Sequence, residues 1–385
     1  MFNFSTLPPL SLYIHFPWCV RKCPYCDFNS HALKTDLPEA AYIEALISDL
    51  EQELPLIWGR SISSIFLGGG TPSLFPPEAL DKLFSALRAQ LVFTPDIEIT
   101  LEANPGAIER GYFSEYRAVG INRLSIGIQS FNDDHLQKLG RIHNRRDAYN
   151  AAEAAHAAGL DNFNLDLMFA LPQQTLAQAL SDLEEAIALE PAHISWYQLT
   201  IEPNTLFHRQ PPTLPCDEHS WKMQQQGRAK LAAADYTQYE ISAYARGAPC
   251  RHNLNYWHFG DYLGIGAGAH GKISQADTQT ICRRWKIKQP AAYLRHAGSE
   301  KQRGGIQVLS ENDASLEFMM NALRLRQGFS AELFMRHTGL PLSFAEKPLR
   351  KAEERGWIQW KKDHIMPTED GQRFLNDLLE LFLPD

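Results

Sequence analysis

The sequence has few cysteines and no long apolar run. Its 385 residues include six cysteines, too few and too clustered for a disulfide framework. No window approaches the ~18 consecutive apolar residues of a transmembrane helix. The first residues, Met-Phe-Asn-Phe-Ser-Thr, lack the basic start and apolar core of a secretory signal. These absences predict a cytoplasmic protein with reduced thiols, and they leave peripheral membrane contact open.

Basic residues are also fewer than acidic residues. Lysine and arginine total 37 against 45 aspartates and glutamates, which gives a net charge of −8. Because phosphate binding requires a basic face, nucleic acid is not an expected partner. The hydrophobic share of 44% is enough for a sizeable core, and the length predicts one large α/β domain with a smaller one.

Three of the six cysteines fall in one loop. Cys19-Val-Arg-Lys-Cys23-Pro-Tyr-Cys26 has the spacing C-x3-C-x2-C, which can bring three thiolates onto one face of a cubane iron–sulfur cluster. Such clusters usually take four cysteines, and no fourth is near, so one iron would be open to a chelating ligand. The alternative is a zinc site completed by His15, His31 or Asp27, although the usual paired C-x2-C units are absent.

Strand-like and helical patterns alternate through the first two hundred residues. The predicted strands are 10–16, 62–67, 97–103, 123–129, 163–169 and 193–199. The predicted helices are 38–54, 76–91, 107–119, 133–139, 146–158 and 175–189. Six such units predict a parallel sheet with right-handed crossovers, closed into a partly open barrel. An open doubly wound sheet is the alternative.

The pattern changes after about residue 200, where prolines precede a helical segment at 217–234. From residue 310 onward, two helical patterns lead to a hairpin at 356–360 and a final helix ending near 381. We therefore divide the chain into a barrel over 1–205, a connecting region over 206–305 and a winged-helix-like module over 306–385. A winged-helix-like module invites a DNA-binding interpretation, but fold does not imply function, and we interpret the last part as a packing or partner module.

Polar residues gather where the predicted strands end, which is where barrels place functional groups. Gly68-Gly69-Gly70-Thr71 lets the backbone approach a ligand closely, although a tight turn would explain it equally well. Glu102 could accept hydrogen bonds from ribose hydroxyls or serve as a structural cap. Gln129 and Arg141 suit a carboxylate or a sugar. Asp166, within an apolar strand, needs a partner such as Arg141 or a ligand.

The cysteine loop, with Tyr25 directly before its last cysteine, resembles the signature of the radical S-adenosylmethionine (SAM) proteins. In that family three cysteines hold a [4Fe-4S] cluster, and the open iron chelates SAM. The resemblance implies that Cys19, Cys23 and Cys26 are the cluster ligands. It also implies the family fold, an α/β partial (β/α)6 barrel of TIM type.

Longer motifs resemble the oxygen-independent coproporphyrinogen III oxidase group. They are Tyr13-Ile-His-Phe-Pro, Gly-Gly-Gly-Thr-Pro-Ser, Ser-Ile-Gly-Ile-Gln-Ser-Phe131 and Asn-Leu-Asp-Leu-Met-Phe-Ala-Leu-Pro172. The resemblance covers the chain nearly end to end, including the C-terminal module. It implies that SAM is bound by Tyr13, Gly69, Gly70, Thr71, Glu102, Gln129, Arg141 and Asp166.

The sequence departs from the oxidases in three respects. Phe28 stands where they carry a further cysteine, and only eighteen residues precede Cys19, where they have a longer segment. In addition, residues 252–257, His-Asn-Leu-Asn-Tyr-Trp, resemble the H-N-x-x-Y-W motif of the heme chaperones within this group.

The residue types of this motif suit heme. A neutral imidazole at His252 is the usual axial ligand of heme iron, and Asn253 could orient it. Tyr256 and Trp257 offer flat faces to a porphyrin, while the neighbouring Arg251 could pair with a propionate. The alternative, from residue types alone, is that these side chains pack an interface. Two weaker ligand candidates are Cys250 and His270, and Cys216 and Cys282 receive no role.

The resemblance implies a chaperone that binds heme and transfers it to acceptor hemoproteins such as respiratory enzymes, while carrying a [4Fe-4S] cluster and SAM. The alternative is an oxidase that decarboxylates two propionates of coproporphyrinogen III. Phe28, the short leading segment and the heme motif favour the chaperone, so we expect no oxidase activity and assign no catalytic residue. A homodimer is left open.

Overall fold

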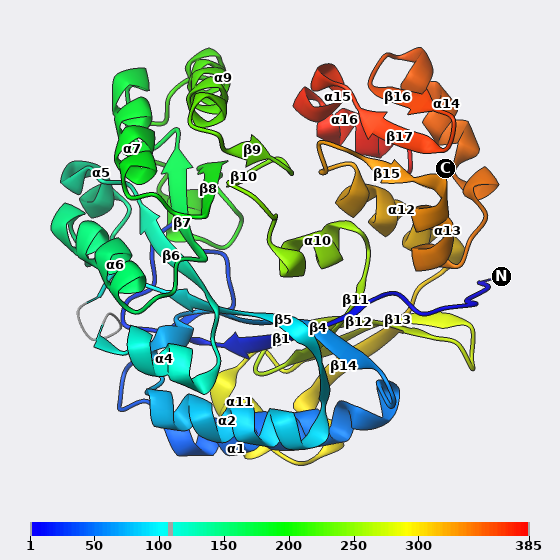
Figure 1. Cartoon of the computed structure of the whole chain (residues 1–385), viewed down its shortest axis with the longest axis horizontal. Coiled ribbons are helices and arrows are strands. Elements are labelled where there is room, and N and C mark those ends of the chain that lie inside the picture. The colour runs from blue at the N-terminus through cyan, green and yellow to red at the C-terminus, as the bar shows by residue number, and fades with distance from the viewer. Residues whose placement is uncertain (1, 107–110, 384–385) are drawn as a thin grey trace.

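A twelve-stranded sheet organises the computed structural model, which describes residues 2–106 and 111–383 (Figure 1). The strand order is β14-β13-β12-β11-β1-β4-β5-β6-β7-β8-β10-β9. The strands from β1 to β8 in this order run parallel. They are β1 (Leu10–Phe16), β4 (Ser61–Gly69), β5 (Val92–Ala103), β6 (Arg123–Gln129), β7 (Phe163–Phe169) and β8 (His193–Gln198). All six predicted strands are present, and the α/β partial barrel is confirmed.

Helices connect these strands and cover the outer face of the sheet (Figure 1). Two of them begin with a capping box, formed by Asn144 with Asp147 and by Thr175 with Gln178. These reciprocal side-chain bonds satisfy the first free backbone groups and fix where each helix starts. The helices are α1 (Glu39–Glu53), α2 (Pro77–Gln90), α4 (Phe113–Val119), α5 (Asp133–Lys138), α6 (Arg145–Ala157) and α7 (Leu176–Ala188). Residues 107–110 of the predicted helix 107–119 lie outside the described residues.

Strands that the periodicity did not predict extend both edges of the sheet. One edge carries β11 parallel to β1 and then three antiparallel strands. They are β11 (Asp261–Ile265), β12 (His270–Gln275), β13 (Thr280–Lys286) and β14 (Arg303–Val308). The other edge carries β9 (Thr237–Gln238) and β10 (Ala243–Ala245). Part of the predicted connecting region therefore belongs to the main sheet.

Short elements and four further helices complete the described part of the chain up to residue 302. None of the helices in the described part of the chain is long and apolar enough to cross a membrane. The helices are α8 (Leu206–Arg209), α9 (Asp217–Ala233), α10 (Arg251–Trp257) and α11 (Pro290–Arg295). The short elements are β2 (Trp18–Cys19), β3 (His31–Ala32), η1 (Leu54–Leu56), η2 (Pro72–Leu74) and η3 (Glu300–Gln302).

The C-terminal module has its own apolar core, which the amino-terminal side chains of Phe2 and Phe4 join. Its three-stranded sheet has the order β15-β17-β16. The hairpin predicted at 356–360 is present, but it spans 358–367 and is formed by β16 and β17. The predicted final helix is divided in two at Phe374. The elements are α12 (Glu311–Ala322), β15 (Phe329–Ser330), α13 (Ala331–Thr338), η4 (Leu342–Phe344), α14 (Glu346–Glu354), β16 (Ile358–Lys361), β17 (His364–Pro367), α15 (Glu369–Arg373) and α16 (Leu375–Glu380).

Candidate functional site

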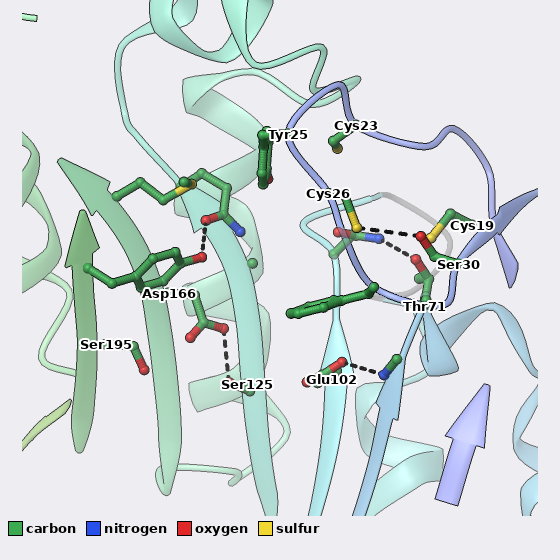
Figure 2. A pocket seen from close by; sticks show the side chains of 18 of the residues that line it. Cys19, Cys23, Tyr25, Cys26, Ser30, Thr71, Glu102, Ser125, Asp166 and Ser195 are labelled. Atoms are coloured by element: carbon green, nitrogen blue, oxygen red, sulfur yellow. Dashed lines mark hydrogen bonds between the residues drawn. The ribbon is translucent and has the colours of Figure 1, made fainter. Parts of the chain in front are cut away.

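The cysteine loop lies at the carboxyl end of the barrel, between β1 and α1. The short strands β2 and β3 pair across its base, and the backbone N–H of Cys26 donates to the carbonyl of Cys23 at 3.2 Å. Cys19, Cys23 and Cys26 are free and half-buried. Figure 2 shows the three cysteines on the loop at one end of a pocket.

The zinc alternative requires a fourth ligand beside the three thiols. In the described part of the chain, no three His, Cys, Asp or Glu side chains are close enough to hold one metal ion. The alternative ligand His15 is engaged with the hydroxyl of Tyr13 and the carbonyl of Asn29, each at 2.9 Å. In a cubane cluster the thiolates bind different irons, so they need not converge on one point. The three thiols are thus compatible with a cluster, and His15 is not free to complete a zinc site.

The pocket has a volume of about 530 Å³ and runs through the barrel interior. Its lining includes Gln129, the last residue of β6, and Arg123, the first residue of the same strand. Of the predicted SAM-binding residues, seven line it: Gly69, Gly70, Thr71, Glu102, Gln129, Arg141 and Asp166. The structure thus brings together the cysteines and most of the predicted site.

The glycine segment leaves no space for side chains. A Cβ atom on Gly69, whose φ is +114°, would lie 2.4 Å from the His15 ring. A Cβ atom on Gly70 would lie 2.5 Å from the carbonyl oxygen of Trp18. The Gly69 N–H donates to Glu102 Oε2 at 3.0 Å. The end of β4 therefore meets the pocket as bare backbone, as a ligand-binding turn requires.

Two carboxyl groups face this pocket, from β5 and β7 (Figure 2). Burial and the nearby Asp166 raise the pKa of Glu102 to about 8. Burial also raises the pKa of Asp166, although Ser125 Oγ donates to it at 2.9 Å and Asn164 Nδ2 at 2.8 Å. A pair of carboxyl groups with spare oxygen acceptors suits a cationic ligand that carries hydroxyl groups.

Arg141 has different partners from the one suggested by sequence. Its Nη2 donates to Asn104 Oδ1 at 2.7 Å and to the carbonyl of Gly127 at 2.6 Å, and its Nη1 lies 3.7 Å from Cys23 Sγ. Asn104 Nδ2 in turn donates to Thr71 Oγ1 at 2.9 Å. Arg141 therefore joins the glycine segment, β6 and the cysteine loop, and it does not neutralise Asp166. Sequence reasoning missed Asn104, which follows β5 directly and lines the pocket.

Gln129 lines the pocket, whereas Tyr13 does not. Gln129 has a positive φ of 70° and accepts a hydrogen bond from the Tyr197 hydroxyl at 2.7 Å. Tyr13 lies behind the lining: its ring is stacked on Phe66, with 6.3 Å between centroids, and its hydroxyl lies 2.9 Å from His15 Nδ1. Tyr13 therefore supports the His15 ring that packs against Gly69.

The predicted heme motif forms helix α10, which packs against β4 (Figure 1). The His252 side chain is buried, and its Nδ1 lies 2.9 Å from Ser64 Oγ. Burial, followed by the charge of Arg123, lowers its pKa to about 3, so the imidazole is neutral. Within the described residues, Nε2 has no hydrogen-bond partner. A neutral imidazole with a free nitrogen is competent to bind iron.

The other motif residues point in different directions. Asn253 is the one of the four predicted heme-binding residues that lines the pocket. Tyr256 meets His252 edge to face, at 4.7 Å and 87°. Trp257 packs under the guanidinium of Arg324 at 4.4 Å. Arg251, suggested by sequence as a propionate partner, instead pairs with Asp96 at 2.5 Å on the surface.

Comparisons with known proteins show the family and agree with the fold. Residues 13–186 match the radical SAM superfamily, and residues 309–374 match the HemN C-terminal domain. Coproporphyrinogen III oxidase (HemN) from Escherichia coli, described as a radical SAM enzyme, superimposes with a TM-score of 0.82. It is 23% identical, and the match covers 98% of this chain and 90% of that one. The fold and site therefore define a radical SAM protein, a class that implies a [4Fe-4S] cluster and SAM.

Relatives that match over nearly their whole length show which radical SAM family this chain belongs to. The chain is 49% identical to heme chaperone HemW of Escherichia coli K12 and 51% identical to that of Haemophilus influenzae, over 98% of this chain and 99% of each relative. It is 33% identical to HemW of Bacillus subtilis over 97% of its length and 99% of that protein. The chain belongs to the HemW family of heme chaperones.

Proposed function

We propose that this protein binds heme reversibly through α10 and delivers it to acceptor hemoproteins such as respiratory enzymes. One observation carries this proposal: the motif helix packs on the barrel strand whose end forms the cofactor pocket. His252 supplies the iron ligand, and Asn253 reaches the pocket from the next position. Because Nε2 is covered in the fold, heme capture requires side chains around α10 to move.

We propose further that Cys19, Cys23 and Cys26 hold a [4Fe-4S] cluster and that the pocket binds SAM. The donor set fits both groups: three half-buried thiols, bare glycine backbone and two carboxyl groups. When bound, the cluster supplies an open iron for the cofactor. Glu102 and Asp166 accept hydrogen bonds from the bound SAM. Arg141 holds the cysteine loop against β6. Thiols of this kind require a reducing compartment, so the proposed location is the cytoplasm.

Heme transfer is the direct test. The purified protein is loaded with heme, freed of excess ligand and mixed with an apo-hemoprotein, and the holo spectrum of the acceptor is followed. Wild-type protein should retain heme when excess ligand is removed and then fill the acceptor, whereas His252→Ala protein, which lacks the iron ligand, should retain less heme at the start. An acceptor that never fills from the loaded protein would contradict the proposal.

The alternative function is coproporphyrinogen III oxidase, which the fold of the neighbouring HemN structure favours. Phe28, at the position of the further cysteine in the oxidases, is 59% exposed at the pocket mouth and cannot bind iron. The test is to incubate reduced protein anaerobically with coproporphyrinogen III and SAM. We expect no protoporphyrinogen, and sustained turnover would establish the oxidase instead.

A further inference from the structure

Arg123 is a buried cation at the far end of the pocket from the cysteines. It begins β6, and only 3% of its surface is exposed. It lines the pocket together with Ser125, Asn164, Ser195 and Asn253. The first three come from barrel strands and the last from α10. The inner end of the pocket is therefore polar, and it adjoins the proposed heme motif.

The guanidinium of Arg123 has few partners. In the described part of the chain, its hydrogen bond is a long one, 3.5 Å from Nη1 to Thr100 Oγ1, and its buried Nε has none. A guanidinium presents five N–H donors in a planar fork and stays charged. Leaving such donors unpaired in a protein interior is costly. The fork is therefore available to an oxyanion that enters from the pocket.

The nearby carboxylates are engaged elsewhere. Glu98 accepts hydrogen bonds from Cys250 Sγ at 3.2 Å and from the backbone N–H groups of Arg251 and His252 at 3.1 and 3.0 Å. It thereby holds the start of α10. Asp166 is held by Ser125 and Asn164. Neither forms an ion pair with Arg123 among the described residues, so both leave the guanidinium fork open.

We propose that Arg123 anchors a propionate carboxylate of the heme, at a subsite on the inner end of the pocket next to Asn253. This rests on the proposed heme-binding function. The position suits the cargo because His252, the iron ligand, precedes Asn253, which shares the pocket lining with Arg123. Of the other arginines, Arg141 holds the cysteine loop and Arg251 pairs with Asp96. Arg21 also lines the pocket, but it is exposed and lies in the cysteine loop. Arg123 thus binds a propionate carboxylate of the heme, while His252 binds the heme iron.

The test compares heme with heme dimethyl ester, in which both propionates are blocked. A charge-assisted hydrogen bond in a buried site predicts that wild-type protein binds heme about 10- to 100-fold more tightly than the ester. Arg123→Met should bind the two with nearly equal affinity. Arg117→Met is the matched control, because Arg117 is exposed and bonds the Ala158 carbonyl, and it should keep the full preference. His252→Ala should change the Soret spectrum and keep the preference.

The outcomes separate the two proposals. If wild-type protein binds neither heme nor the ester, the heme-binding function fails. If it binds both equally, or if folded Arg123→Met keeps the preference for heme, the Arg123 subsite fails and the function stands. Should Arg123→Met not fold, the wild-type titrations are combined with Arg123→Lys, which keeps the charge without the fork. That variant should retain less than a third of the wild-type preference, and full retention overturns the subsite.

Discussion

The ring of Phe66 lies nearly parallel to the imidazole of His252, with 5.0 Å between centroids and 27° between planes. Phe66 also lines the cofactor pocket, whereas His252 is buried behind it. One side chain of β4 therefore stands between the proposed cofactor site and the proposed heme ligand. Because Nε2 of His252 is covered, the proposed binding of heme there requires the local packing around this pair to change.

The hydroxyl of Ser64 should tune the heme ligand. Ser64 Oγ lies 2.9 Å from His252 Nδ1 and 2.7 Å from Ser11 Oγ. A hydrogen bond donated by Nδ1 leaves the lone pair on Nε2, and such supporting partners typically contribute about 10- to 100-fold to metal affinity. We expect Ser64→Ala to weaken heme binding by about tenfold in a Soret titration. Ser63→Ala is the control: the Ser63 hydroxyl donates to the Leu10 carbonyl, and its removal should leave the heme affinity unchanged. Equal affinities for all three proteins would remove Ser64 from this role.

The three loop cysteines should account for all the non-heme iron of the protein. Anaerobically purified protein should contain about four iron and four sulfide per chain. Replacement of Cys19, Cys23 and Cys26 by Ala should remove both. Cys216→Ala is the control, since that thiol is exposed and lies outside the pocket lining. Zinc without sulfide in the wild-type protein would exclude the cluster.

The sequence predicted the parallel barrel because each of its strands and helices has a regular apolar pattern. It did not predict β11, β12 and β13, because these strands bury charged residues in ion pairs. Lys272 is paired with Asp261 at 2.9 Å, and Lys286 with Glu53 at 2.8 Å. Such pairs break the apolar alternation that identifies a strand, and Glu53, the partner of Lys286, lies far away in sequence.

The candidate site was predictable where the chain itself places residues together. Glycines and polar residues at strand ends meet at one edge of a parallel sheet, so Gly69, Glu102 and Gln129 could be found from position alone. Phe66 and Arg123 contact the pocket from within their strands, through the barrel interior. Sequence spacing does not reveal the depth of a pocket. The burial of His252 likewise depends on how α10 packs against β4.

The backbone at Gly70 should tolerate no side chain. A Cβ atom there would lie 2.5 Å from the Trp18 carbonyl oxygen and 2.8 Å from that of Phe16. Both contacts are with backbone, so the glycine segment or the cysteine loop must shift. We expect Gly70→Ala to lower stability by about 1–3 kcal/mol and to reduce the iron content. Gly111→Ala, where a Cβ atom would meet nothing within 4 Å, should match wild type in urea unfolding and in iron assays. Normal iron content in folded Gly70→Ala protein would contradict this expectation.

Glu102 should make the ligand-free protein less stable as the pH rises. Its pKa is raised from 4.5 to about 8 by burial and by the neighbouring Asp166. Between these values the unfolded chain loses this proton, whereas the folded chain keeps it. The free energy of unfolding therefore falls as the pH rises from 4.5 to 8.

Glu102→Gln removes this dependence and keeps an oxygen acceptor for the Gly69 N–H. Each pH unit would ideally change the relative stability by about 1.4 kcal/mol, but the carboxyl group faces an open pocket, which reduces the effect. We expect the variant to gain about 2 kcal/mol over wild type between pH 5 and pH 8, measured by urea unfolding at both values. A difference that does not change with pH would mean that Glu102 is already ionised in the folded protein. In that case Glu102 would present a fixed negative charge to the pocket before any cofactor binds.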